Sequence, residues 1–106
     1  MNSASLETRL ADLAAAGETI AYGDLARELG LRMADLTREL ESLMEADAAA
    51  GQPFRAALLR QRLSPDRLPA PGFFQKAAAL GRPTDDPAAF TKAERTALHL
   101  CPNIPG

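Results

Sequence analysis

The stretch from Thr19 to Gly30 constrains the fold more than any other part of the chain. It reads TIAYGDLARELG, which predicts a short extended segment, a helix of barely two turns and a glycine that stops the helix. A second, longer helix is predicted to begin a few residues later. Two helices joined by so short a turn are typical of a helix-turn-helix motif, and we expect the rest of the chain to bury it.

Apolar residues at helical spacing, together with glycine and proline breakers, predict five helices in all. They are expected over residues 5–16, 24–29, 34–50 and 73–80, and in a last helix that begins with Pro87. Gly23 or Asp24 is predicted to cap the helix over 24–29. Asp86 is predicted to cap the last helix, where Pro87 takes the first helical position.

Three further segments are predicted to form two strands and a loop. Residues 18–21 and the Ala/Leu-rich segment 53–62 are expected to pair in a small antiparallel sheet of two or three strands. The segment 63–72 contains three prolines and a glycine, which exclude regular structure and stiffen a loop. The predicted fold class is α+β, mainly α: a single winged helix-turn-helix-like domain over 1–106, with C-terminal helices and a flexible tail over 101–106.

Composition excludes several classes of protein. No apolar run approaches the ~20 residues of a membrane-spanning helix, and the N-terminus lacks the basic and apolar regions of a signal peptide. The single cysteine, Cys101, cannot form an internal disulfide. We therefore expect a cytoplasmic protein that makes no contact with a membrane.

Charge is distributed unevenly along the chain. The net charge is only −2, but residues 1–50 hold four arginines against ten carboxylates. Residues 51–84 hold six basic residues against one acidic residue. Such asymmetry marks either an interaction face or two parts of one fold that complement each other, and the sequence leaves both readings open.

The helix over 34–50 opposes ordinary DNA recognition. As the second helix of a helix-turn-helix it would lie in the major groove, where only its first turns need approach the bases. Its charged residues sum to −4, because Arg38 stands alone against five carboxylates. Phosphates repel such a face, since affinity for duplex DNA comes mainly from neutralising them. The residues of those first turns that could contact the bases are Thr37, Arg38 and Glu41.

A basic set on the strand, loop and short helix is the remaining functional candidate. Together with Arg38, its members are predicted to meet nucleic-acid phosphates from the wing and its surroundings. They are Arg55, Arg60, Arg62, Arg67, Lys76 and Arg82. The alternatives are a solvated surface and a protein-interaction module. In that module the acidic helix over 34–50 binds a basic partner or the basic loop of another copy.

No catalytic or cofactor-binding pattern is present. The pair His99 and Cys101 falls short of the four ligands of a structural zinc site, and phosphate-binding glycine motifs are absent. Asp86 is explained by helix capping. Tyr22 could stack on a nucleic-acid base, but a single tyrosine beside a helix cap is more often a half-buried core residue. We therefore predict a protein that is not an enzyme and that binds no cofactor or metal.

Three segments carry a resemblance to a family of bacterial winged-helix-like proteins. They are Tyr22–Ala26, Gly51–Pro53 and Pro71–Phe74, and the similar region spans about 60 residues from Ile20 to Gly81. The resemblance implies the fold and no particular activity.

A more distant likeness is to the DNA-binding domain of alkylguanine-DNA alkyltransferases and alkyltransferase-like proteins, which share the Tyr-Gly-x-Leu-Ala opening. Here Phe54 stands at the position of the family's nucleophilic cysteine, and the family's His-Arg pair is missing. Without a thiolate there is no acceptor for an alkyl group. That resemblance therefore implies only a scaffold, in which Arg38 is a loose counterpart of the family's arginine finger.

Overall fold

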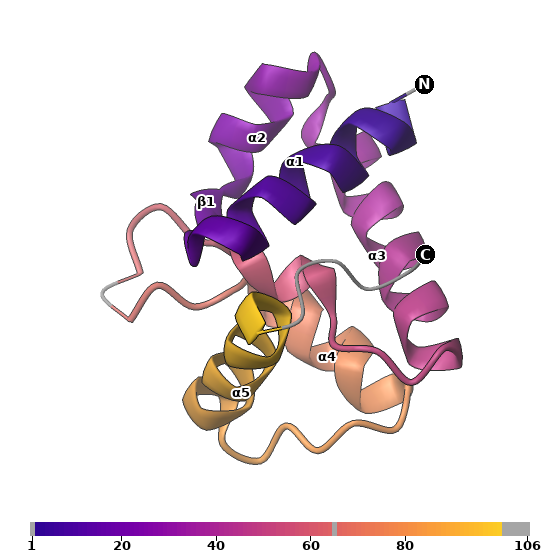
Figure 1. Ribbon diagram of the computed structural model, residues 1–106, viewed down its shortest axis with the longest axis vertical. Coiled ribbons are helices and arrows are strands. Elements are labelled where there is room, and N and C mark those ends of the chain that lie inside the picture. The colour runs from indigo at the N-terminus through magenta and orange to yellow at the C-terminus, as the bar shows by residue number, and fades with distance from the viewer. Residues whose placement is uncertain (1, 65, 101–106) are drawn as a thin grey trace.

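The computed structural model describes residues 2–64 and 66–100, with side chains from Leu6 onward. This part forms five α-helices, one short 3-10 helix (η1) and a two-stranded sheet (Figure 1). The elements in chain order are α1 (Asn2–Ala16), β1 (Ile20–Ala21), α2 (Tyr22–Leu29), α3 (Met33–Ala49), η1 (Arg55–Leu58), β2 (Leu59–Arg60), α4 (Pro71–Ala79) and α5 (Pro87–Leu100). The predicted tail over 101–106, with Cys101, lies outside the described residues.

The core gathers around η1 and the segment that leads into it. Helices α1, α3 and α5 all pack against η1, and Phe54, just before it, is fully buried. The Phe54 ring meets Phe73 of α4 and Phe90 of α5 edge-on, with centroids 6.1 and 6.4 Å apart. The small residues Ala56 and Ala57 let the helices approach η1 closely. Within the described residues, no helix is long and apolar enough to cross a membrane.

The predicted pair of helices is present as α2 and α3, joined by a turn over 30–32. Gly30 ends α2 in the left-handed region at φ 68°, where glycine carries no steric penalty, and its N–H bonds back to the last turn. The predicted cap at Gly23 or Asp24 is wrong, because α2 already begins at Tyr22 with Ala21 in the capping position. Asp24 lies instead in the first turn, at the positive end of the helix.

The cap predicted for the last helix is confirmed. The backbone N–H of Ala89 donates to Oδ1 of Asp86 at 3.2 Å, and Pro87 is the first residue of α5. Proline costs nothing there, because the first N–H groups of a helix have no intrahelical acceptor.

The sheet is parallel, and the predicted antiparallel pairing is wrong. Ile20 pairs with Leu59 and Ala21 with Arg60. The chain leaves β1 directly into α2, continues through α3 and η1, and then enters β2, which runs in the same direction as β1. Strands joined by such a crossover run in the same direction.

The strand predicted over 53–62 is also largely wrong. Only Leu59–Arg60 is extended, and Arg55–Leu58 forms the 3-10 turn η1. All four residues from Ala56 to Leu59 are buried, so burial does not alternate along this segment as it would in a strand with one exposed face. A turn of helix enclosed by other helices buries consecutive residues, which a half-exposed strand cannot do.

The segment over 61–70 projects from the body as a loop, at the left of Figure 1. Its two arms are tied at the base, where the N–H of Gln61 donates to the carbonyl of Leu68 at 2.9 Å. The Ser64 hydroxyl accepts from the N–H of Leu68 at 3.1 Å. At the C-terminal end of the loop, the N–H of Ala70 donates to Oη of Tyr22 at 2.9 Å. This bond anchors the loop to α2.

Candidate nucleic-acid interface

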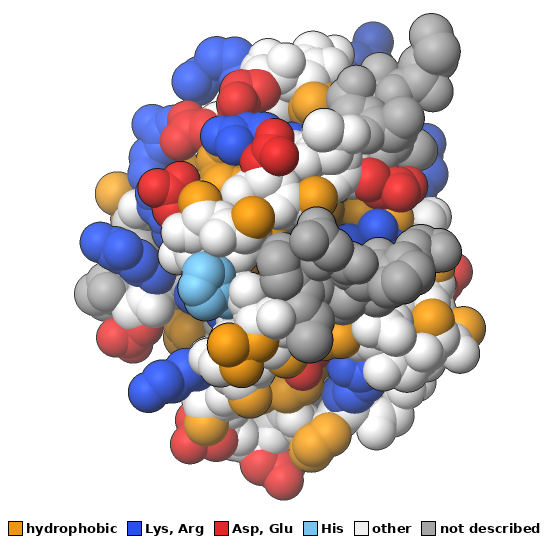
Figure 2. Space-filling view, in the orientation of Figure 1, with side chains coloured by type: hydrophobic (Ala, Val, Ile, Leu, Met, Phe, Trp, Pro, Cys, Tyr) orange, Lys and Arg blue, Asp and Glu red, His pale blue; other side chains and the backbone are white. Residues whose placement is uncertain are grey.

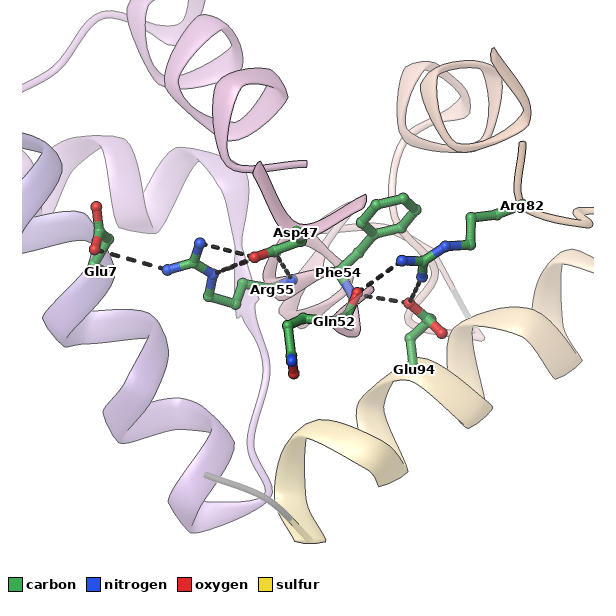
Figure 3. A network of polar contacts seen from close by, with 7 residues as sticks. All are labelled: Glu7, Asp47, Gln52, Phe54, Arg55, Arg82 and Glu94. Atoms are coloured by element: carbon green, nitrogen blue, oxygen red, sulfur yellow. Dashed lines mark hydrogen bonds and ion pairs between the residues drawn. The ribbon is translucent and has the colours of Figure 1, made fainter. Parts of the chain in front are cut away.

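Arg55, one of the predicted phosphate-binding residues, is a structural residue at the start of η1. Asp47 of α3 is only 5% exposed, and its carboxylate accepts the backbone N–H of Arg55 at 3.0 Å and its Nη2 at 2.8 Å (Figure 3). Glu7 of α1 lies 3.7 Å from Nη1 of the same guanidinium. Arg55 thus joins α1, α3 and η1, and its charge is compensated on both sides.

Arg82 is a second structural arginine (Figure 3). Its Nη1 bonds Glu94 of α5 at 3.1 Å, and its Nη2 donates to the carbonyl of Gln52 at 2.8 Å. The guanidinium carbon stands 4.2 Å from the centroid of the Phe54 ring, in cation–π geometry. Glu94 also accepts the N–H of Phe54 at 2.8 Å, so this network fixes the segment that enters η1.

Lys76 and Arg38 are both paired with carboxylates of α3. Nζ of Lys76, on α4, lies 2.6 Å from Glu45, and this hydrogen bond raises the pKa of Lys76. Arg38 lies 3.6 Å from Asp35, one turn earlier on α3, and both side chains are largely exposed. Exposed pairs of this kind contribute little to stability and do not hold a side chain firmly.

The charge asymmetry of the sequence is therefore satisfied largely within the fold. At least three of the five carboxylates of α3 are paired with basic residues, among them Asp35, Glu45 and Asp47. Lysine and arginine side chains are interspersed with carboxylates over the face in Figure 2, rather than gathered into one sheet of charge. Arg55, Lys76 and Arg82 serve this internal pairing and do not form a common surface with the loop.

Three arginines gather at the projecting loop, where Arg60 and Arg67 lie close enough to the Arg95 guanidinium to repel it, and we call them the arginine cluster. They are Arg60 of β2, Arg67 of the loop and Arg95 of α5, and none makes an ion pair within the part of the chain that the structure describes. Nε of Arg60 donates to the Thr19 hydroxyl at 3.2 Å. Arg62, the loop's other arginine, is paired with Asp24 at 2.8 Å, with both side chains well exposed.

Arg95 is the residue that the sequence analysis missed. Its Nε donates to the carbonyl of Ala57 at 2.6 Å and its Nη2 to that of Leu59 at 3.2 Å. Burial lowers the pKa of the Arg95 guanidinium, the nearby Tyr22 side chain opposes that shift, and repulsion from Arg60 and Arg67 adds to it. The only sequence signal is the spacing of Lys92, Arg95 and His99, which puts all three on one face of a helix.

A cavity of about 390 Å³ adjoins the cluster between the C-terminal end of α1 and α5. Arg95, Glu18, Thr19, Thr96 and His99 contribute its polar lining. Nδ1 of His99 lies 3.0 Å from the carbonyl of Ala14, so it carries a proton and donates there. The lining thus combines one cation, Arg95, with one carboxylate, Glu18, and the hydroxyl groups of two threonines among mostly small apolar residues.

The described side chains contain no group of three or more His, Cys, Asp or Glu residues that could hold a metal ion. No family model, no curated protein and no solved structure matches this chain.

Proposed function

We propose that the protein binds nucleic acid through phosphates, without enzymatic activity, in the manner of a winged-helix domain whose wing is the loop over 61–70. The arginine cluster carries the proposal. Arg60, Arg67 and Arg95 hold three positive charges near the loop, and no carboxylate pairs with them among the described residues. Positive groups held together in this way repel each other, and an anion relieves the repulsion.

Phosphate is the anion that arginine suits best. The planar guanidinium donates two parallel N–H bonds to phosphate oxygens, and it keeps its charge at every physiological pH. Arg95 has part of its donors committed to backbone carbonyls, which orient it, whereas Arg67 is exposed on the loop. Contacts of this kind fix position on a backbone and carry no sequence information. We therefore propose weak binding with little dependence on base sequence.

The loop rather than α3 is the proposed binding element. Glu41 remains on the exposed side of α3 and Arg38 is already paired with Asp35. A helix with these charges gains little from lying against phosphates.

A titration of labelled duplex DNA by fluorescence anisotropy tests the proposal. We expect binding at about 50 mM salt that weakens steeply by about 200 mM, with a log–log slope near −3 if about three phosphates are neutralised. Arg67→Ala is expected to weaken binding and to reduce the slope by about 1. Arg38→Ala is the matched control, because it removes another exposed arginine, from α3.

Two results would contradict the proposal. One is the absence of binding at low salt. The other is an equal loss in Arg38→Ala and Arg67→Ala, which would return the binding surface to α3. Single-stranded DNA of the same length distinguishes a duplex reader from a general binder of phosphates.

The second candidate function is a protein-interaction module. Binding of a basic partner by the acidic face of α3 is poorly supported, because most carboxylates of α3 are paired within the fold. A different observation favours a protein partner: an apolar groove runs beside α3.

A further inference from the structure

An apolar groove lies between α3, α4 and the ends of the projecting loop. Its volume is about 380 Å³. Its main lining residues are Tyr22, Met33, Leu40, Glu41, Met44 and Phe73. From Met33 to Met44 the α3 residues in the lining recur at helical spacing, so the groove follows α3 for roughly 16 Å. A groove of this length fits a segment of polypeptide.

Two properties of the lining suit an apolar side chain from a partner. Met33 and Met44 stand at the two ends of the α3 stripe, and methionine adapts its shape to an incoming group. Met33 is 48% exposed, which is unusual for a large apolar residue in this molecule. Covering it would remove apolar surface from water.

The groove also has an acidic side. Glu41 lies in its lining, is exposed, and makes no ion pair among the described side chains. The neighbouring Glu45 is occupied by Lys76. Glu41 also attracts Lys76 electrostatically, but none of the described side chains lies within ion-pair distance of it. A segment that carries a cation beside its apolar residue would therefore find a carboxylate there.

The chain itself carries such a segment in the projecting loop, at residues 62–64, which we call the loop tip. Leu63 is 90% exposed, the highest value among the large apolar residues with described side chains. Arg62 precedes it, and its exposed guanidinium is held only by the surface carboxylate of Asp24. Leu63 and Arg62 thus present an apolar group and a cation next to each other, which matches the groove and Glu41.

We propose that the loop tip of a second copy of this chain occupies the groove, with Leu63 against its apolar lining and Arg62 toward Glu41. Gln61, at the base of the loop, itself lines the groove, so the loop and the groove share an edge. That placement allows a two-fold arrangement in which each copy inserts its loop tip into the other. Such an interface closes on itself and gives a dimer rather than a chain of molecules.

Sedimentation velocity over a range of protein concentrations, without nucleic acid, tests the dimer. We expect the wild-type chain to form a concentration-dependent dimer, and Leu63→Asp to abolish it. Leu100→Asp is the matched control, because Leu100 is also an exposed leucine (72%) but lies on the last turn of α5. It is expected to leave the dimer unchanged.

A mixing experiment separates docking from damage to the fold. Met33→Asp spoils the groove and keeps the loop, and an acidic residue in the first turn of α3 does not harm the helix. Leu63→Asp spoils the loop and keeps the groove. Each variant alone is expected to be monomeric, whereas the mixture regains one of the two contacts and forms a weaker one-to-one complex.

The charge contact has its own test. Glu41→Lys is expected to weaken the dimer at least tenfold, and adding Arg62→Glu to the same chain to restore part of that loss. A wild-type chain that stays monomeric at the highest concentration would overturn the proposal. So would a dimer that persists in Leu63→Asp, or a mixture of the two variants that fails to associate. None of these outcomes bears on the arginine cluster, whose residues are intact in every variant.

Discussion

The carboxylate of Asp47 binds both the backbone N–H and the guanidinium of Arg55, eight residues further along the chain (Figure 3). One carboxylate therefore neutralises a positive charge and fixes the backbone where α3 gives way to η1. In the sequence, Asp47 counts among the carboxylates that argue against DNA binding by the helix, and Arg55 among the basic residues that favour DNA binding. In the folded chain they cancel each other.

Asp47→Asn is expected to destabilise the protein by about 2–3 kcal/mol, because it leaves Arg55 without its main counter-charge at a largely buried site. The measurement is chemical denaturation followed by circular dichroism. Asp35→Asn is the control, since its pair with Arg38 is exposed, and it should change stability by less than about 0.5 kcal/mol. Equal effects of the two substitutions would mean that the Asp47 pair contributes no more than a surface pair.

Arg82→Lys is expected to lower stability by about 1–2 kcal/mol although it keeps the charge. A lysine can still reach Glu94 but cannot also donate to Gln52 and lie flat over the Phe54 ring. Arg27→Lys, at an exposed pair with Asp24, is the matched control and should be nearly neutral. A neutral Arg82→Lys would show that only the charge at this position matters.

The helices could be predicted from the sequence because their signals are local. Apolar stripes and terminating glycines locate α2 and α3 to within two residues, and Gly17, Gly30, Gly51 and Gly81 all adopt positive φ. The sheet could not be predicted in the same way. A strand of two residues is too short to show an alternation of apolar and polar residues. Its parallel pairing depends on how α2 and α3 connect the two strands.

The candidate site was predicted only in part, for a related reason. Arg60 and Arg67 were among the candidates from the sequence. Arg95 was not, because it lies about 30 residues away, on a helix whose pattern indicates only packing. The pairs that neutralise Lys76 and Arg55 join α3 to other elements. Which charges meet is decided by how helices pack, and a count of charges along the chain carries no such information.

Thr91→Val is expected to stabilise the protein by about 1 kcal/mol. The Thr91 side chain is 1% exposed, and its hydroxyl oxygen has no hydrogen-bond partner among the described residues. Valine replaces the hydroxyl by a methyl group of similar size and removes the cost of burying it. Thermal unfolding measures the change. Thr91→Ala should destabilise, because it leaves a cavity, and stabilisation by alanine but not by valine would refute the explanation.

Tyr22 is the only tyrosine of a chain without tryptophan, so its ionisation can be followed directly by phenolate absorbance. Burial raises the pKa of Tyr22 above its ordinary value of 10.0, against smaller opposite effects of the Ala70 hydrogen bond and the Arg95 charge. The folded protein should therefore titrate above pH 10.0 and the denatured chain near it.

The sign of the stability change with pH follows from that shift. The stabilisation from the protonated phenol is complete below the unfolded pKa and is lost as the pH rises through the folded pKa. Arg95→Gln should raise the Tyr22 pKa further, since it removes the positive charge that lowers it. A folded-state pKa at or below 10.0 would contradict the burial of this ring.

Arg67 holds a backbone conformation that arginine disfavours. It is the one non-glycine residue with positive φ among those described, at 56°, and an L-residue in this region carries a steric cost that glycine avoids. Arg67→Gly is therefore expected to raise stability by about 0.5–1 kcal/mol. The same substitution removes one charge of the arginine cluster, so it should weaken DNA binding as much as Arg67→Ala does. Arg67→Ala keeps the unfavourable backbone and should give no gain in stability. A chain that becomes more stable and binds less tightly would indicate that the arginine serves the ligand rather than the fold, whereas a loss of stability in Arg67→Gly would assign it a structural role in the loop.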